Sequence, residues 1–235
     1  MIKIEDTEVW GFRKAIKGMR NAMNSWDKSD SKECRLGCVV TDVSLEDTEC
    51  NMMCGGYALR GYTQIGEKDM ELAKRLIKAG SPDRKFMRMI HVQADITAPE
   101  TFLMQLDTYK VGTVSNSTSK MHTIHKRDLT VDDFSHDYTP VEEFQPIVDR
   151  LNELRSFYIA SKNKAYWNAL IEQLPMSFMQ RRTIDMDYET LFNIHHQRKH
   201  HKLNEWREFC DWITTLPYMK EFLGLEETND SREAD

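Results

Sequence analysis

Two stretches of the sequence carry side chains that suit an anionic ligand. Residues 113–120, Thr-Val-Ser-Asn-Ser-Thr-Ser-Lys, are rich in hydroxyls and have no apolar period, which predicts a loop. Loop hydroxyls and amides can hydrogen bond to a phosphate or a base edge, although a flexible, solvated loop is the alternative. Residues 195–202, His-His-Gln-Arg-Lys-His-His-Lys, form a basic stretch around Arg198. Such a stretch attracts phosphate through its charge, or it is a solvated basic surface.

Four cysteines form two pairs with C-x3-C spacing: Cys34, Cys38, Cys50 and Cys54. Four thiolates can close a tetrahedral zinc site, but the usual knuckle has C-x2-C spacing, whereas three intervening residues suit one turn of a helix. We therefore expect no zinc and interpret the four as ordinary thiols in a surface insertion. The alternative is an interaction module organised by zinc. The fifth cysteine, Cys210, falls in an amphipathic stretch and is expected in the core.

One pair of histidines also has a spacing that can hold a metal. His196 and His200 are one helical turn apart. Because no carboxylate accompanies them at a ligand-forming offset, a solvated basic face is the favoured interpretation, and we expect no metal here either.

Composition limits the class of protein. The 235 residues, 40% of them hydrophobic, are enough for one domain with a proper core. A net charge of −6 argues against general nucleic-acid binding, which needs a broad basic surface. No apolar run approaches the roughly 20 residues that cross a bilayer, and the N-terminus has no secretory segment. With an odd number of cysteines, these features predict a cytoplasmic protein with reduced thiols.

The elements that must position these side chains follow from hydrophobic periodicity. Residues 86–96 alternate with a period of two, which predicts a half-buried strand. A capping box at Thr97 and Glu100, with Pro99 in the first turn, starts a helix that Gly112 can end. Helical spacing predicts further helices over residues 11–23, 67–79, 141–154, 165–174, 188–201 and 204–216.

These elements predict a single α+β domain. The domain covers residues 1–225, with a cysteine-containing insertion at about 32–58, and residues 226–235 form an acidic tail. No internal repeat and no linker interrupts it.

Several separated segments keep the spacing of a known motif. Ser81-Pro82 comes shortly before the predicted strand, and Pro99 opens the helix that holds Gln105. Residues 108–121, Thr-Tyr-Lys-Val-Gly-Thr-Val-Ser-Asn-Ser-Thr-Ser-Lys-Met, keep the spacing of R-H-R-x-x-S-x-N-x-x-S-x-R-Y with most identities changed. Further on, Leu174-Pro175 is followed by a helix with Asn193 and Arg198.

Together these segments, over about residues 67–212, resemble the flavin-dependent thymidylate synthases. The chain looks like a divergent, phage-type member with a degenerate Arg-His-Arg motif. The resemblance implies helices packed on a mainly antiparallel sheet, and a homotetramer with active sites between subunits. It also implies a flavin-dependent methyl transfer, the reductive methylation of dUMP to dTMP. FAD would carry a hydride to a methylene group taken from methylenetetrahydrofolate, with NADPH as co-substrate.

The resemblance also assigns roles to residues of this chain. Positions that contact the nucleotide fall on Gln105, Thr118, Lys120 and Arg198. Positions that bind the cofactor fall on Thr108, Tyr109, Lys110, Asn116 and Asn193. Arg198 would be the catalytic residue, because a guanidinium can pair with a uracil carbonyl and stabilise charge that develops in the ring.

The departures from the motif keep a second hypothesis open. Thr108 and Tyr109 replace two side chains with strong flavin and phosphate interactions, and Asn116 stands at the position of a glutamate. The alternative is therefore a flavin-less pyrimidine-nucleotide-binding protein, a sensor or regulator, with the same fold.

Overall fold

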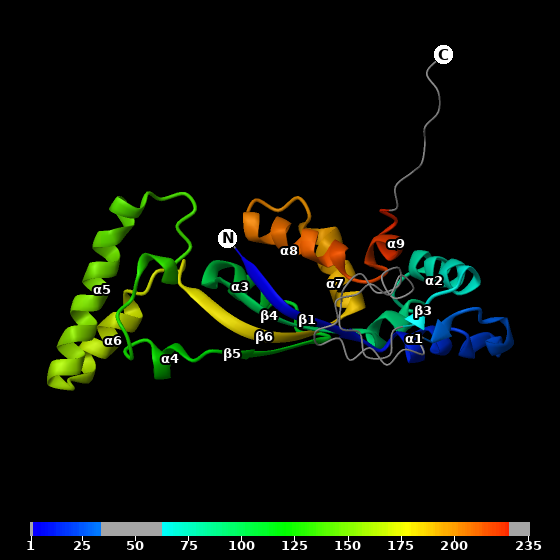
Figure 1. The fold of residues 1–235 in the computed structure, drawn as a ribbon, viewed down its shortest axis with the longest axis horizontal. Helices are drawn as coiled ribbons and strands as arrows, with labels where there is room; N and C mark the ends of the chain where they lie inside the picture. Colours follow the sequence, from blue (N-terminus) through cyan, green and yellow to red (C-terminus); the bar gives the residue numbers. More distant parts are fainter. Residues whose placement is uncertain (1, 34–62, 226–235) are drawn as a thin grey trace, which may run out of the picture.

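The computed structural model describes residues 2–33 and 63–225. Within these ranges the chain forms nine α-helices, a four-stranded sheet and a two-stranded sheet (Figure 1). In chain order the helices and strands are β1 (Lys3–Trp10), α1 (Phe12–Gly18), β2 (Lys32–Glu33), β3 (Thr63–Gln64), α2 (Glu67–Ala79), β4 (His91–Pro99), α3 (Glu100–Leu106), β5 (Thr113–Ser117), α4 (Lys120–Thr123), α5 (Val141–Ser161), α6 (Lys164–Glu172), β6 (Met179–Asp187), α7 (Tyr188–Arg198), α8 (Asn204–Thr215) and α9 (Met219–Leu223). A 3-10 turn, η3 (Lys85–Met89), precedes β4.

The main sheet is antiparallel throughout, with the strand order β1-β4-β6-β5. At one end of the central pair His91 lies opposite Asp187, and at the other end Pro99 lies opposite Met179. Since β4 runs directly into α3 and β6 directly into α7, the two helices leave the sheet at opposite ends. The chain after α3 must then return to the end where α7 begins, because β5 starts with Thr113 opposite Met186.

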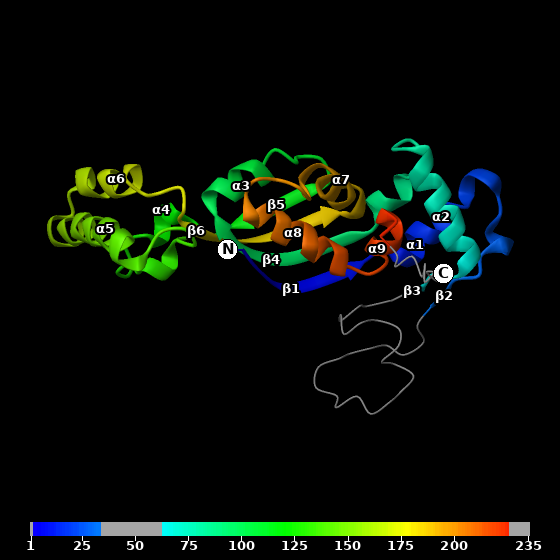
Figure 2. The ribbon, with the colours of Figure 1, turned by 90° about the horizontal axis from the view of Figure 1, so that it is seen from above.

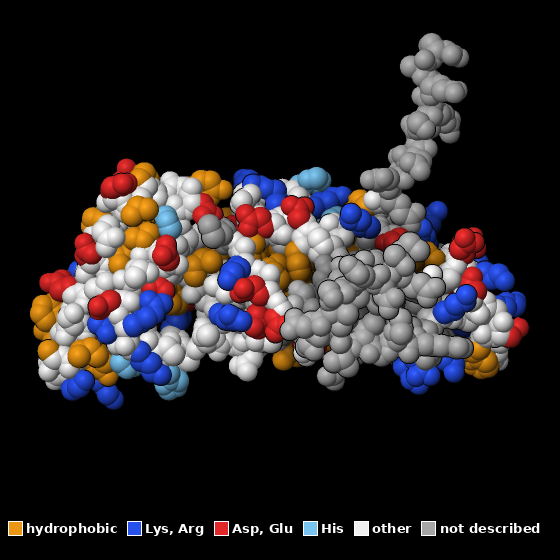
Figure 3. Space-filling model, viewed as in Figure 1, with side chains coloured by type: hydrophobic (Ala, Val, Ile, Leu, Met, Phe, Trp, Pro, Cys, Tyr) orange, Lys and Arg blue, Asp and Glu red, His pale blue; other side chains and the backbone are white. Residues whose placement is uncertain are grey.

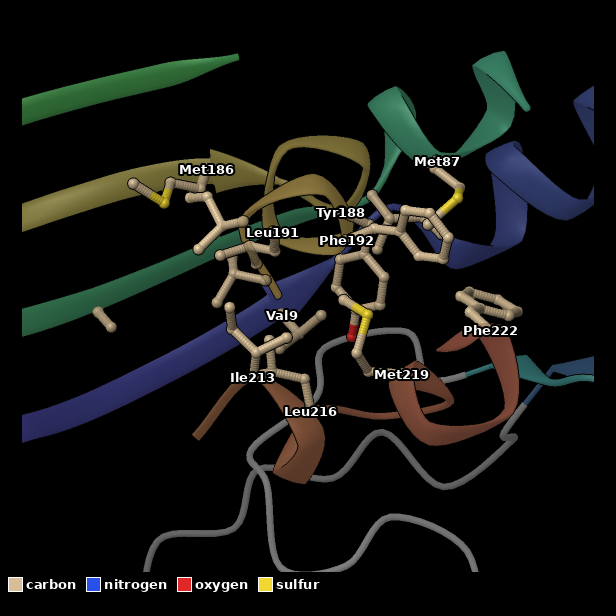
Figure 4. Packing of buried hydrophobic residues seen from close by; sticks show 14 of the residues in the cluster. Val9, Met87, Met186, Tyr188, Leu191, Phe192, Ile213, Leu216, Met219 and Phe222 are labelled. Carbon is tan, nitrogen blue, oxygen red and sulfur yellow. The ribbon is translucent and has the colours of Figure 1, made fainter. Parts of the chain in front are cut away.

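One face of the sheet is covered by helices and the other is polar. In β4 the side chains of Val92, Ala94 and Ile96 are buried, whereas Gln93, between the first two, is exposed. Figures 1 and 2 show α3, α7 and α8 on the same side of the sheet. Residues of α7, α8 and α9 pack against this face in the main core (Figure 4). Burial of each large apolar side chain contributes about 1.5–3 kcal/mol.

A second, separate core lies in the segment between β5 and β6. α4, α5 and α6 extend beyond the end of the sheet (Figures 1 and 2), where Phe144, Val148, Leu151 and Leu170 are buried together. α5 begins at Val141 and contains Pro146 in its second turn, where proline cannot donate the hydrogen bond that a helical backbone N–H normally makes.

The predicted α+β class, with helices on an antiparallel sheet, is confirmed. The loop predicted for residues 113–120 is wrong in its first part, because residues 113–117 form β5. This edge strand pairs with β6, yet its side chains are mostly exposed and show no apolar alternation. The sequence analysis did not predict β6 itself. The strand predicted over 86–96 starts only at His91, because Phe86 and Met87 are both buried in the η3 turn.

The predicted capping box at the start of α3 is also absent, since Pro99 is the cap residue and no side chain caps the helix. Cys34, Cys38, Cys50, Cys54 and the acidic tail lie outside the described residues. None of the helices in the described ranges combines the length and the apolar character required to span a membrane.

Candidate functional site

A cleft opens where the chain returns from α3 to the start of α7. It encloses about 370 Å³ and is called here the first cleft. Its walls come from the turn before η3, the segment after α3 and the exposed side of α7. The lining residues are Ser81, Arg88, Thr108, Tyr109, Lys110, Val111, Asp187, Glu189, Thr190, Asn193 and Gln197.

The segment after α3 is held against α7 by a tight turn at Gly112. The backbone N–H of Asp187 donates to the Gly112 carbonyl at 2.9 Å, and the Thr190 hydroxyl donates to the Val111 carbonyl at 2.9 Å. Gly112 has a φ of +68°, and a Cβ built on it would lie 2.0 Å from Oδ2 of Asp187. A glycine is therefore required here, both by the left-handed backbone and by the close approach of the carboxylate.

Two carboxylates line the cleft: Asp187, the N-cap residue of α7, and Glu189 in its first turn. The pKa of Asp187 is raised and that of Glu189 is lowered. Burial raises the pKa of Asp187, although the Thr190 N–H donates to its Oδ1 at 2.7 Å and opposes that effect. Burial alone would also raise the pKa of Glu189, but hydrogen bonds from Arg88, Ser81 and Arg84 outweigh it and hold that pKa below its usual value. Asp187 is thus the carboxylate of the cleft that takes up a proton more readily.

The Glu189 carboxylate is the centre of a network that reaches across the cleft wall. Ser81 Oγ donates to it at 2.6 Å and Arg84 Nε at 3.0 Å, and Arg88 forms an ion pair with it. Arg84 also donates to Oδ1 of Asn193 at 3.0 Å. The Glu189 side chain is 5% exposed and the Arg88 side chain 49%, so Arg88 keeps a surface toward solvent and the cleft.

Beside the cleft, a chain of polar and aromatic contacts joins three of the predicted site residues: Gln105, Tyr109 and Arg198. Arg198 Nε donates to the hydroxyl of Tyr109 at 2.9 Å, and the Tyr109 hydroxyl donates to Gln197 at 3.0 Å. The guanidinium carbon of Arg198 lies 4.9 Å from the centre of the Trp206 ring. Trp206 Nε1 donates to Oε1 of Gln105 at 2.8 Å. Arg198 is thereby oriented by hydrogen bonding and by a cation–π contact.

Six of the predicted site residues therefore lie in or beside one cleft. Four of them line it, and two more are linked to its edge through Tyr109 and Trp206. They are Thr108, Tyr109, Lys110 and Asn193 in the lining, and Gln105 and Arg198 beside it.

The other three predicted residues lie elsewhere, on and after β5. Asn116 is exposed on the edge strand, opposite Thr183. Thr118 donates through its backbone N–H to the Arg181 carbonyl at 2.9 Å, and Lys120 forms an ion pair with Glu100 at the start of α3. Within one chain these three residues do not line the first cleft, and they are called here the edge group.

The basic stretch 195–202 is only partly exposed to solvent. His195 is buried, and burial lowers its pKa, whereas His196 is exposed and hydrogen bonds to the Phe192 carbonyl. Among the described residues, no three His, Cys, Asp or Glu side chains are grouped to hold a metal. Cys210 is buried as predicted, and burial raises the pKa of its thiol to about 12.

The sequence analysis missed Arg88, Asp187, Glu189 and Thr190 in the cleft lining, and Arg84 beside it. Arg84 and Arg88 are four residues apart, a spacing that places two side chains on the same side of a helical turn. An acidic residue early in a helix is a further signal for Glu189, because carboxylates favour the first turn.

No protein-family model matches the chain, and no curated protein sequence matches it. Solved structures do match its three-dimensional form. The crystal structure of thymidylate synthase X (ThyX) from Helicobacter pylori with FAD and dUMP superposes with a TM-score of 0.66, covering 95% of this chain and 97% of the other. The chain has a ThyX-like fold.

A second crystal structure of ThyX from Helicobacter pylori, also complexed with FAD and dUMP, agrees equally well. Its TM-score is 0.66, and the alignment covers 94% of this chain and 97% of the other. The sequence identity is 14% in both comparisons. At this identity the ThyX likeness extends to the arrangement of helices and strands, whereas the individual side chains have diverged.

Proposed function

We propose that this chain is a flavin-dependent thymidylate synthase-like enzyme that methylates dUMP to dTMP. FAD is its cofactor, methylenetetrahydrofolate the one-carbon donor and NADPH the reductant. The observation that carries the proposal is the nearly full-length agreement in fold with a protein crystallised with FAD and dUMP. The motif residues of this chain differ from those typical of the family, and a phage origin is not needed for the proposed activity.

The chemistry of the first cleft suits part of a flavin dinucleotide. Tyr109 offers an aromatic ring to a flat ring system, Lys110 and Arg88 offer positive charge to phosphates, and Asn193 offers an amide. FAD supplies the redox chemistry when it is bound. Because about 370 Å³ is small for a whole dinucleotide, the volume favours a site that a second copy of the chain completes.

We assign the nucleotide to the neighbourhood of Arg198. Its guanidinium is held by the Tyr109 hydroxyl and the Trp206 ring, so it can face a uracil carbonyl with little loss of side-chain freedom. Thr118 and Lys120 belong to the edge group, and Lys120 offers charge to the phosphate of the nucleotide. We propose that the edge group of one copy meets the first cleft of another, in a homotetramer.

One observation favours the second candidate, a pyrimidine-nucleotide-binding protein without flavin. The first cleft contains two carboxylates, Asp187 and Glu189, and Glu189 already neutralises Arg88. The cations left free match the single phosphate of a nucleotide better than the diphosphate of a flavin dinucleotide, which carries more negative charge.

The deciding experiment is an absorbance spectrum of the purified chain, before and after loading with FAD, followed by titration with dUMP. Flavin bands that shift on addition of dUMP, together with formation of dTMP from methylenetetrahydrofolate and NADPH, are the expected result. A chain that binds dUMP but retains no flavin after desalting would support the nucleotide-binding candidate instead. A chain that binds neither would contradict both.

A further inference from the structure

A second cleft lies at the α1–α2 end of the molecule. It encloses about 580 Å³ between α1, the turn after it, the end of α2 and η3. This volume is within the range of small-molecule sites. Figure 2 shows α1 and α2 side by side at this end, and Figure 3 shows Lys and Arg side chains there. We call it the lysine cleft.

Three lysines line this cleft: Lys14, Lys17 and Lys85. Lys14 and Lys17 are three residues apart on α1, so their side chains lie on one side of that helix, and Lys85 comes from η3. All three are exposed, and none forms an ion pair in the part of the chain that the structure describes. The cleft therefore presents three lysines that form no ion pair with a carboxylate of the described residues.

The floor of the lysine cleft is apolar. Phe86 and Met19 are 3% and 9% exposed, and Leu76 and Met89 complete the surface. Methionine sulfur and aromatic edges form a surface that adapts to a flat ring. Gly18 lines the same cleft, and a Cβ built on it would meet only Sδ of Met89, at 3.6 Å. The absence of a side chain at this position leaves the cleft open.

One acidic residue, Asp83, also lines the lysine cleft. Its carboxylate can accept a hydrogen bond from an N–H or O–H of a ligand, but it repels a second negative charge placed beside it. The combination favours a molecule whose anionic group lies at one end and whose hydrogen-bond donor lies at another.

We propose that the lysine cleft is a binding site for a small aromatic acid. The ligand has a flat apolar body on the methionine-rich floor, a carboxylate, sulfonate or phosphate among the three lysines, and a donor group toward Asp83. This site is separate from the proposed FAD and nucleotide site. The segment between them supplies Ser81 and Arg88 to the first cleft, and Pro82 and Met89 to the lysine cleft.

The probe for the test is 6-(p-toluidino)-2-naphthalenesulfonate, which combines an aromatic body with a sulfonate and an N–H at opposite ends. We expect saturable fluorescence with one site per chain, and weaker binding at high salt because the lysines are exposed. The triple variant Lys14→Ala, Lys17→Ala, Lys85→Ala should bind about tenfold more weakly, as expected for loss of several exposed ion pairs. The neutral analogue N-phenyl-2-naphthylamine, which lacks the sulfonate, should bind both proteins equally.

Two experiments test where the probe binds: a substitution that fills the lysine cleft, and NMR spectra of the chain with methyl-labelled methionines. Gly18→Phe should abolish binding by occupying the cleft, and methyl-labelled methionines should show shifts at Met19 and Met89. Lys110→Ala, which removes an exposed lysine that lines the first cleft and lies outside η3, is the control and should leave the affinity unchanged. Folding of each variant is checked by circular dichroism, and the lysine variant carries the test if Gly18→Phe does not fold. Equal affinity of the triple variant and the parent chain, or methyl shifts at other methionines, would overturn the proposal.

Discussion

The first cleft and the edge group differ in how firmly a single chain holds their side chains. In the first cleft, Glu189 is fixed by three donors and Arg198 by a hydroxyl and an aromatic ring. In the edge group, Asn116 is exposed on a strand that has a neighbour on one side, and among the described residues the Lys120 side chain forms one ion pair, with Glu100. One chain therefore holds these two side chains less firmly than it holds Glu189 and Arg198.

The largest effect is expected from the centre of the first cleft. Glu189→Gln removes the charge that pairs with Arg84 and Arg88, of which Arg84 is 15% exposed at its side chain. We expect a loss of about 2 kcal/mol in the free energy of unfolding, because a mostly buried cation is left without its partner. Urea denaturation measures it. Glu172→Gln, the same change on the exposed end of α6, is the control and should be neutral.

This loss should depend on pH in a defined direction. The pKa of Glu189 is lowered in the folded state, so its stabilising contribution is present above its ordinary pKa and disappears as the pH falls through the folded value. The parent chain and Glu189→Gln should therefore converge in stability in acid. A constant difference between them across the acid range would contradict the assigned network.

Arg198→Ala tests the link between the cleft and the nucleotide. We expect dUMP to bind about tenfold to a hundredfold more weakly, because a charge-assisted contact of about 1.5–3 kcal/mol is lost. Calorimetric titration measures the affinity. Arg207→Ala, on an exposed part of α8, is the matched control. Unchanged affinity in Arg198→Ala would place the nucleotide elsewhere.

Lys120→Ala asks whether the edge group takes part in the same site. We expect dUMP affinity to fall by about tenfold and the free energy of unfolding to fall by about 1–2 kcal/mol, because the Glu100 side chain, which is 16% exposed, loses its partner. Lys126→Ala, nearby and exposed, should have no effect.

Mixing the Lys120→Ala and Arg198→Ala proteins sharpens this comparison. If sites form between copies, mixed assemblies contain some sites with both residues intact, and binding of dUMP should partly recover after co-refolding. Absence of recovery, with mixed assemblies present, would show that both residues act from the same chain.

The smallest effect is expected at Asp187. Its pKa is raised in the folded state by burial, so its ionised form is less favourable there than in the unfolded chain. Asp187→Asn keeps an oxygen that can accept from the Thr190 N–H, and should therefore be neutral or stabilising by less than about 1 kcal/mol at neutral pH. A thermal unfolding series measures this. A large destabilisation would show that the charge of Asp187, rather than its hydrogen bond, holds the start of α7.

The sequence by itself determined the helices that carry strong local signals. The stretch 67–79 has a regular apolar face, acidic residues at its start and Gly80 after its end, and it forms α2 with those bounds. The stretch 204–216 agrees with α8 to within one residue. The resemblance to the flavin-dependent thymidylate synthases also brought Thr108, Tyr109, Lys110 and Asn193 into one group of candidates, and they line one cleft.

Only the tertiary structure decided the strands with weak local signals and the partners of the charged groups. β5 and β6 are rich in polar residues, and they become strands because their backbones hydrogen bond to each other and, in β6, to β4. The partnership of Glu189 with Ser81, Arg84 and Arg88 spans about a hundred residues of chain, a separation no local period can encode. The sequence therefore determined which side chains were available for binding, and long-range strand pairing decided which of them meet in one chain.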